Sequence, residues 1–371
     1  EEVAQTLRDL RAAGVAIVLL GELTGPASLV LVRPEPGWRV VERREGLFGT
    51  VQVSERRQGA AVLRRLRLNQ RFRMGGRQAF AERRMGHMPL LLCPGARDVL
   101  FVGVGTGATL GAARSHPLRS ITAVEIVPEI VAVLPRFAAI NNRVLDDERV
   151  ELHAADARRH LAACPRRVDL VVADLIHPAR EGASSLLAVE HFDNVLRCLR
   201  RGGALAQWLP LHQLDPHNLR TVLRTLLAVF PRAHAFIGLY NARMPILLVV
   251  GTRAGDALRV DPRHVARMLA APPVAGRDRP GQFVQDARDL LGAYLLDRAA
   301  LADFAGQGPL NTDLRPRVLF DAPRSAYEDR ASLARASLRA LLPLRRPCPD
   351  ALIAGSLEPD RRRALRAAVD R

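Results

Sequence analysis

The sequence contains no lysine, and all 55 of its basic residues are arginine. The formal net charge of +17 would by itself suggest a surface that binds phosphate. Because the arginines are scattered in twos and threes and lysine is absent altogether, codon bias explains the excess better than phosphate binding does. Aromatic residues make up only 4% of the chain, too few for platforms that stack single-stranded nucleic acid. We therefore expect no nucleic-acid partner.

Cysteine is also scarce, and no two cysteines have the Cys-x-x-Cys spacing. The four residues are Cys93, Cys164, Cys198 and Cys348. This spacing argues against a disulfide framework or a zinc ribbon and favours a reducing compartment. The apolar run over residues 15–32 is interrupted by Glu22 and by Gly25-Pro26, so it predicts a buried segment rather than a membrane span. We expect a cytoplasmic protein, with the inner face of a membrane as the alternative location.

Composition and periodicity divide the chain into four regions. We expect an apolar leader over residues 1–36, a small antiparallel β-sheet domain over 37–77, a Rossmann-like nucleoside-binding catalytic domain over 78–252 and a mainly helical extension over 253–371. Alternation of apolar and polar residues with period two predicts the strands of the small sheet. Within the extension we expect loops around 271–281 and 305–325.

A pattern of apolar strands separated by helical stretches begins after Pro94-Gly95. Strands are expected at residues 98–103, 120–125, 150–156, 168–174 and 203–209. This alternation predicts a parallel sheet with helices on both faces. Residues 234–240 and 246–251 are separated by only five residues, too few for a crossover, so these two strands should pair antiparallel. The fold class is therefore α/β, with a class I methyltransferase-like, mostly parallel sheet and an antiparallel last strand.

Chemistry-bearing residues follow four of these strands. The turn Gly103-Val104-Gly105-Thr106-Gly107-Ala108 lets a ligand approach the backbone and the N–H groups that open the next helix. Glu125 ends the second strand, where a carboxylate can accept both ribose hydroxyls, although a dinucleotide site would share these two features. Asp156 can accept from an adenine amino group, and Asp174 would lie over the reacting end of a nucleoside. The four strand ends together favour an S-adenosyl-type ligand over a dinucleotide.

Further motifs follow in a set order along the chain. They are Arg84-Met85-Gly86-His87-Met88-Pro89-Leu90, the glycine turn, Glu125, Asp156, Asp174 and Gln207-Trp208-Leu209. This order resembles the spermidine synthase (polyamine aminopropyltransferase) family, over about residues 38–325. The sequence is most similar to spermidine synthase-like domains that are fused to membrane transporter-like segments. Those domains share the loop at 174–178, the stretch at 207–211 and an element at 311–316.

The resemblance implies an enzyme that moves an aminopropyl group from decarboxylated S-adenosylmethionine to an amine such as putrescine. It implies no permanently bound cofactor and no metal. Asp174 matches the family's catalytic acid, and Tyr240 matches a tyrosine that supports the attacking amine. His177 is a second candidate base, with a simple loop hydrogen bond as its alternative role. Glu82 and His87 are candidates for substrate binding, with a structural contact as the alternative for His87. A homodimer and a membrane-protein partner are the assemblies that we expect.

Three positions depart from the family pattern. Thr106 replaces an acid in the glycine turn, His177 replaces a second acid in the catalytic loop, and Ala81-Glu82 replaces a Tyr-Gln pair. With fewer carboxylates, affinity for putrescine or spermidine should fall. An acid in the turn would repel the carboxylate of intact S-adenosylmethionine, and threonine does not. Two alternatives therefore stay open: an S-adenosylmethionine-dependent methyltransferase, and a non-catalytic domain that binds a nucleoside or polyamine.

Overall fold

The computed structural model describes most of the chain between residues 35 and 353. The described ranges are 35–69, 72–76, 79–174, 176–180, 182–241, 243–253, 255–270, 284–325 and 327–353. The apolar run of the expected leader and the loop expected around 271–281 lie outside these ranges. Within the described ranges, no helix combines the length and the apolar character needed to cross a lipid bilayer.

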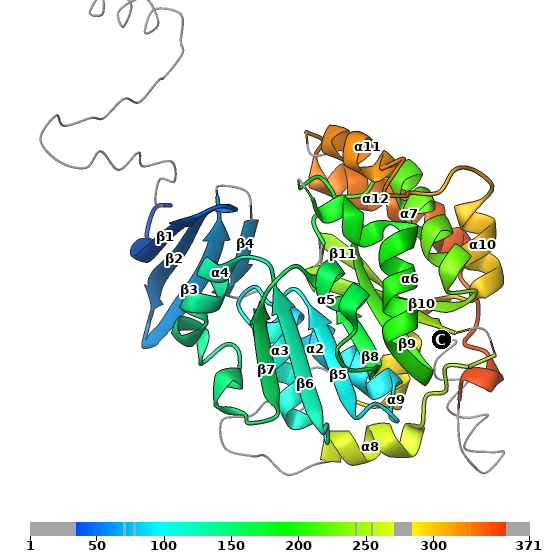
Figure 1. Ribbon diagram of the computed structural model, residues 1–371, viewed down its shortest axis with the longest axis horizontal. Helices are drawn as coiled ribbons and strands as arrows, with labels where there is room; N and C mark the ends of the chain where they lie inside the picture. Colours follow the sequence, from blue (N-terminus) through cyan, green and yellow to red (C-terminus); the bar gives the residue numbers. More distant parts are fainter. Residues whose placement is uncertain are drawn as a thin grey trace, which may run out of the picture.

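A small antiparallel sheet of four strands comes first in the described chain (Figure 1). Its strands are β1 (Arg39–Gly46), β2 (Gly49–Gln58), β3 (Ala61–Leu68) and β4 (Phe72–Gly75). Val51 and Val53 of β2 and Leu66 and Leu68 of β3 are buried against apolar side chains of α4 (Pro128–Val133). The alternation in the sequence produces this apolar face, because every second residue of a strand points to the same side.

The second sheet has eight strands in the order β12-β10-β11-β9-β8-β5-β6-β7. The strands are β5 (Asp98–Val102), β6 (Ser120–Glu125), β7 (Val150–Ala154), β8 (Val168–Ala173), β9 (Leu199–Pro210), β10 (Arg232–Asn241), β11 (Met244–Thr252) and β12 (Tyr294–Leu296). Strands β5 to β9 are parallel, whereas β11 runs antiparallel to both β9 and β10. The fold expected from the sequence is confirmed. The three-residue β12 was not predicted, because so short a strand leaves no periodic pattern.

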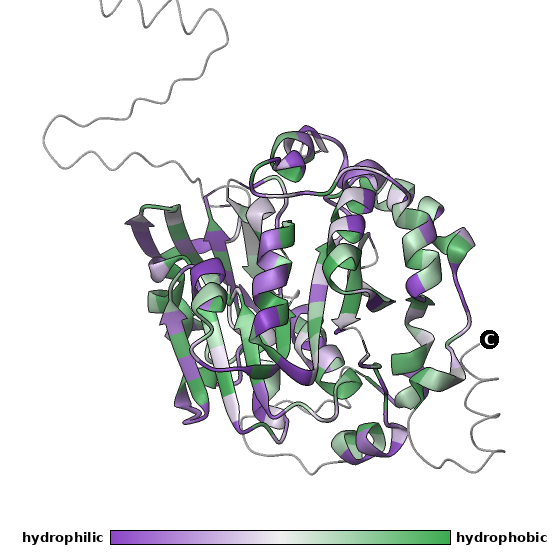
Figure 2. Ribbon diagram, turned by 45° about the vertical axis from the view of Figure 1, so that its right-hand side comes forward, coloured by the Kyte–Doolittle hydropathy of each residue, from purple (hydrophilic) through white to green (hydrophobic). Residues whose placement is uncertain are grey.

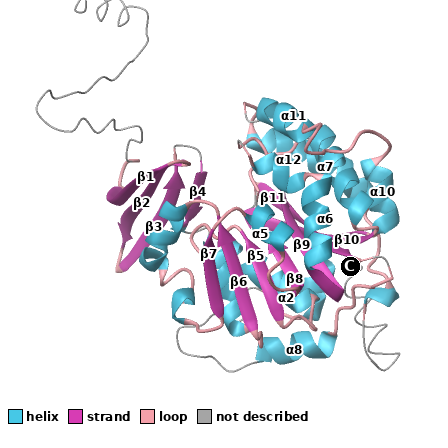
Figure 3. Ribbon diagram, viewed as in Figure 1, coloured by secondary structure: helices cyan, strands magenta, loops and turns pink. Residues whose placement is uncertain are grey.

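Helices cover both faces of the large sheet (Figures 1 and 3). One face carries α2 (Ala79–Leu92), α3 (Ala108–Ala112), α8 (Pro262–Ala270) and α9 (Ala287–Gly292), and the other carries α5 (Ala157–Ala163), α6 (Val189–Cys198), α7 (Pro216–Val229) and α10 (Arg298–Ala305). Along β5, Val99 and Phe101 point into the first layer and Leu100 and Val102 into the second. Figure 2 accordingly shows the strands of this sheet mainly in the apolar colour.

The C-terminal extension packs beside α7 through two more helices, α11 (Arg317–Ser325) and α12 (Arg330–Leu341). The loop expected over 305–325 is wrong for its second half, which forms α11. The Pro323 inside this helix and its many charged residues hid the helical pattern. α7 begins as the sequence predicts, with the Asp215 carboxylate accepting from the backbone N–H of Asn218 at 2.9 Å and Pro216 in the first turn.

A disulfide bond joins Cys164 and Cys198, whose Cα atoms lie 5.4 Å apart. The expectation drawn from cysteine spacing was therefore wrong for this pair. The two residues are 34 positions apart and meet only because Cys164 caps the end of α5 and Cys198 ends α6. Cysteine spacing consequently gives no argument here for a reducing compartment.

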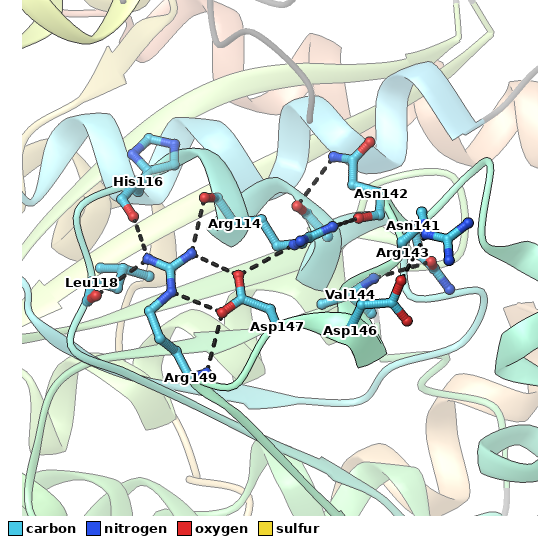
Figure 4. Close-up of polar contacts among 11 residues, drawn as sticks. Arg114, His116, Leu118, Asn141, Asn142, Arg143, Val144, Asp146, Asp147 and Arg149 are labelled. Carbon is cyan, nitrogen blue, oxygen red and sulfur yellow. Dashed lines mark hydrogen bonds and ion pairs between the residues drawn. The ribbon is translucent and has the colours of Figure 1, made fainter. Parts of the chain in front are cut away.

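Charged side chains brace the loops at the amino ends of β6 and β7 (Figure 4). The Arg149 guanidinium donates to the Asp147 carboxylate at 2.7 Å and to the carbonyl oxygens of Arg114, His116 and Leu118. Hydrogen bonds from Arg149 hold the pKa of Asp147 well below its usual range, and Arg114 adds to the effect. This network fixes the edge of the sheet opposite to the glycine turn.

Gly86 allows α2 and α3 to pack closely. A Cβ atom placed on Gly86 would lie 2.2 Å from the carbonyl oxygen of Thr109 and 2.7 Å from the Cβ of Ala112. We expect Gly86→Ala to lower the free energy of unfolding by about 1–3 kcal/mol, despite the better helix propensity of alanine. Urea unfolding measures this. Gly292→Ala in α9, where nothing lies within 4 Å of the added Cβ, is the control and should not destabilise. Equal stability of both variants would contradict the close packing.

Candidate active site

The carboxyl edge of the parallel strands brings four predicted site segments together. The backbone N–H of Gly103, after β5, donates to the carbonyl oxygen of Val124 in β6 at 2.9 Å. On the other side, the N–H of Asp174 donates to the carbonyl oxygen of Val102 at 3.1 Å. The glycine turn therefore lies between Glu125 and Asp174, at the edge where open α/β sheets bind ligands.

The turn needs its glycines for conformational reasons. Gly103, Gly105 and Gly107 have φ values of +85°, +55° and +80°, a region that other residues rarely adopt. A Cβ on Gly107 would also lie 3.0 Å from the Cβ of Asn141. The Asn141 side-chain amide donates to the carbonyl oxygen of Thr106 at 3.3 Å and so holds the turn from outside. The backbone conformation of the turn is therefore fixed by its glycines and by Asn141.

Glu125 is held rigidly beside this turn. One carboxylate oxygen accepts from the N–H groups of Val104 and Gly105 at 3.0 and 3.3 Å, and the other accepts from the N–H of Val127 at 3.0 Å. The side chain is 6% exposed. Each carboxylate oxygen has two lone pairs, so the oxygen that accepts only from Val127 keeps acceptor capacity for a hydroxyl group of a ligand. Ile126, the next residue, is 41% exposed although it is apolar, which suits contact with a flat ring.

The two aspartates at this edge differ in their local contacts. Asp156 caps α5, and one of its carboxylate oxygens accepts from the N–H of Arg158 at 2.8 Å. Its other oxygen remains available to an amino group. Asp174 follows β8 directly, and its Cβ lies 3.8 Å from the position that a Cβ on Gly103 would occupy. Asp174 is thus adjacent to the turn, where a carboxylate can meet the reacting part of a bound nucleoside.

Glu82 brings a further carboxylate to the turn. One of its oxygens accepts from the Thr106 hydroxyl at 2.9 Å, and the other accepts from the N–H of Gly75 at 2.8 Å. The Glu82 side chain is 6% exposed. A carboxyl group from α2, 24 positions earlier in the chain, is therefore hydrogen-bonded to the glycine turn.

His177 joins a short chain of hydrogen-bonded side chains. Its Nδ1 lies 2.9 Å from Gln213 Oε1, and Gln213 Nε2 lies 3.1 Å from His212 Nε2. Burial lowers the pKa of both histidines to about 4; the Gln213 hydrogen bond and the Pro245 carbonyl oppose the shifts at His177 and His212 respectively. Both imidazoles are therefore neutral at pH 7, and Gln213 orients the ring of His177.

Two predicted site residues need separate comment. His87 is fully buried, with its Nδ1 3.0 Å from Nε2 of His116, near the amino edge of the sheet. Because α2 runs away from the turn after Glu82, the structure does not bring His87 to the site, in agreement with its structural alternative. Tyr240 lies near the carboxyl end of β10, while its side chain is outside the described residues.

Sequence reasoning missed His212, Gln213 and Arg180. His212 and Gln213 lie two and three residues after the end of β9, so the strand-end rule that identified Asp174 could have found them. Arg180 sits on the same loop as His177, and its N–H donates to the His177 carbonyl oxygen at 2.9 Å. Burial lowers the pKa of Arg180, and the charge of Glu125 opposes this shift. Among the described residues, no group of three or more His, Cys, Asp or Glu side chains could hold a metal ion.

Comparison with known proteins agrees with this geometry. Residues 79–250 match the model of the spermine/spermidine synthase domain. This part of the chain is therefore similar to the spermine/spermidine synthase domain. The matched domain contains α2, the glycine turn, all three strand-end acids and the His177–Gln213–His212 chain.

Relatives of similar sequence cover part of the chain. A polyamine aminopropyltransferase 2 from Hyperthermus butylicus is 28% identical over 190 residues, which are 49% of this chain and 62% of that protein. A polyamine aminopropyltransferase 2 from Pseudomonas aeruginosa is 33% identical over 156 residues, 41% of this chain and 44% of that protein. The chain thus spans less than two thirds of the length of either relative.

Solved structures of the family share the fold. A spermidine synthase in complex with the transition-state analogue AdoDATO superposes with a TM-score of 0.57 at 17% identity, over 70% of this chain and 86% of that one. Spermidine synthase from Thermotoga maritima gives 0.55 at 16% identity, over the same shares of each chain. The small antiparallel sheet followed by the large mixed sheet is therefore common to these proteins and to this chain.

Proposed function

We propose that this chain is an aminopropyltransferase of the spermidine synthase type. The donor would be decarboxylated S-adenosylmethionine, and the acceptor an amine such as putrescine. The observation that carries the proposal is the row of Glu125, the glycine turn and Asp174 along one edge, inside the segment that matches the family. Glu125 would accept the ribose hydroxyls, and Asp156 would accept from the adenine amino group.

The proposed reaction requires a general base. The acceptor nitrogen attacks the methylene carbon next to the sulfonium, and the carbon–sulfur bond breaks to leave methylthioadenosine. The attacking nitrogen must lose a proton, since an ammonium group has no lone pair. Asp174 would bind this amine and accept the proton, with neutral His177 close by as a second acceptor. Holding donor and acceptor side by side supplies much of the remaining acceleration.

Glu82 supports a cationic donor over the methyltransferase alternative. Its buried carboxylate touches Thr106 in the turn and would pair with the terminal ammonium of the decarboxylated donor. Intact S-adenosylmethionine carries a carboxylate beside that amine, which Glu82 would repel. The neutral Thr106 therefore does not by itself make the turn tolerant of the intact donor.

Calorimetric titration of the wild type and Glu82→Gln tests this function. We expect the wild type to prefer decarboxylated over intact S-adenosylmethionine, and putrescine to strengthen donor binding. In Glu82→Gln the affinity for the decarboxylated donor should fall about 30-fold, because a charged partner is lost. Methylthioadenosine lacks the terminal amine, so its affinity should change less than about threefold. Glu151→Gln on the exposed edge strand β7 is the control and should behave like the wild type.

The other outcomes point elsewhere. Equal or better binding of intact S-adenosylmethionine by the wild type would overturn aminopropyl transfer and favour methyl transfer. Binding of neither donor would favour a non-catalytic domain. An equal loss of methylthioadenosine and donor binding in Glu82→Gln would show that Glu82 only supports the turn.

A further inference from the structure

Asn311, in the C-terminal extension, closes the loop that begins at Asp174. Its side chain is 1% exposed, and its Nδ2 donates to the carbonyl oxygens of Ser184 and Leu187 at 3.2 and 3.0 Å. Its backbone carbonyl accepts from the N–H of Val189, the first residue of α6, at 3.0 Å. One buried asparagine therefore bonds both the end of the loop and the first residue of α6.

Asn311 is itself held from two directions. Its backbone N–H donates to the Thr225 hydroxyl of α7 at 2.9 Å. Its side-chain oxygen accepts from the N–H of Val318 in α11 at 3.1 Å. Both polar atoms of the amide side chain are therefore hydrogen-bonded. Aspartate could not replace asparagine here, because Nδ2 donates to two carbonyl oxygens and a carboxylate oxygen cannot donate.

The residues after Asn311 extend this attachment to a second site element. The backbone N–H of Asp313 donates to the carboxylate of Glu190 in α6 at 3.0 Å. The Asp313 carboxylate pairs with Arg158 at 2.5 Å. Arg158 lies in the first turn of α5, immediately beyond the Asp156 cap. The segment 311–316, here called the clasp, therefore connects α5, α6 and α7 at the edge that carries the site.

The same extension also holds the loop after β9. The Ser325 hydroxyl donates to the Asp215 carboxylate at 2.6 Å, and the Ser337 hydroxyl donates to the carbonyl oxygen of Leu214 at 2.8 Å. Both serines are almost completely buried. Leu214 follows Gln213, which orients His177. The two loops that carry the candidate acid and bases are thus both fastened to the extension.

We propose that Asn311 is a positioning residue of the active site: by fixing residues 184–189 it sets where Asp174 and His177 meet the acceptor amine. The catalytic part of this inference rests on the proposed function. The sequence identified the 311–316 element by resemblance alone. A buried asparagine that bonds backbone groups of Ser184, Leu187 and Val189, 122 to 127 positions earlier, gives this element a structural role.

Asn311→Asp is the sharpest test, because it keeps the shape and the bond from Val318 but turns two attractive contacts into oxygen–oxygen repulsion. We expect kcat/KM for the acceptor to fall about 10- to 100-fold, since small displacements of reacting groups are costly. Binding of methylthioadenosine should stay within about threefold, because the Asn311 amide bonds Ser184 and Leu187, whereas Glu125 is held by the glycine turn and Val127. Amide hydrogen exchange over residues 182–190 should become about tenfold faster.

Asn194→Ala is the matched control, since the side-chain oxygen of this buried asparagine accepts from Arg197 within α6. It should leave all three measurements near wild type. Unchanged hydrogen exchange over 182–190 in Asn311→Asp would overturn the inference, whatever the activity. An equal loss of acceptor turnover and methylthioadenosine binding would also overturn it and indicate general loss of structure. A wild type without transferase activity, but with the expected exchange difference, would refute the proposed function and leave the loop attachment standing.

Discussion

Asp174→Asn is expected to reduce aminopropyl transfer by about 1,000-fold while leaving nucleoside binding intact. Asparagine keeps the size of the side chain and its place after β8, but it cannot accept the proton of the attacking amine. General bases of this kind contribute roughly 10²- to 10⁴-fold. Steady-state formation of methylthioadenosine from the decarboxylated donor and putrescine measures the loss, and calorimetry with methylthioadenosine checks the binding.

The control for this substitution is Asp193→Asn, at an exposed position of α6 far from any strand end. It should retain full activity. If Asp174→Asn kept more than about a tenth of the wild-type rate, Asp174 would not be the base, and neutral His177 would become the leading candidate. A parallel loss of methylthioadenosine affinity would instead mean that the aspartate shapes the nucleoside pocket.

The core of the fold could be predicted because its pattern is local. The parallel strands β5, β6 and β8 are short apolar runs that end at a glycine or an acid, and the order of strands and helices restricts the topology. The same logic placed Glu125, Asp156 and Asp174 at one edge, since the carboxyl ends of parallel strands must coincide. Periodicity failed where elements are short or carry proline, as in β12 and α11.

The rest of the site depends on contacts between residues far apart in sequence. No spacing rule links Glu82 to Thr106, Gln213 to His177, or Cys164 to Cys198, because each pair meets only when helices and loops have packed. In the sequence, Thr106 therefore looked like the loss of an acid. The structure shows that a neighbouring helix supplies a carboxylate to the same turn. A residue that departs from a motif therefore has to be assessed together with the side chains that pack around it in the fold.

Four buried histidines should make the protein sensitive to mild acid. They are His87, His116, His191 and His212, each at most 3% exposed. Burial lowers the pKa of His116 and His191 to about 3 and that of His212 to about 4, and it holds the pKa of His87 well below 6.5. In the unfolded chain each imidazole takes up a proton near pH 6.5.

Below pH 6.5 the unfolded chain therefore binds more protons than the folded protein does, and the free energy of unfolding must fall. The stabilisation is complete above pH 6.5 and is lost progressively as the pH falls toward 4 and below. Four such groups together lower the free energy of unfolding by roughly 4 kcal/mol between pH 6 and pH 5. Such a loss is a large part of the stability of an ordinary domain. Urea unfolding at pH 7, 6 and 5 measures it.

His191→Leu isolates one of the four groups. Neither ring nitrogen of His191 has a hydrogen-bond partner among the described residues, so leucine removes a titrating group without removing a bond. Between pH 6 and pH 5, the decrease in the free energy of unfolding should be about a quarter smaller for this variant than for the wild type. The control is His217→Gln, at an exposed position of α7, which should show the same decrease as the wild type. A wild type as stable at pH 5 as at pH 7 would contradict the neutral, buried state of these side chains. In that case the protonated imidazoles would have to be solvated by water or paired with a carboxylate inside the folded protein. Such contacts require the helical layers on both faces of the sheet to open locally.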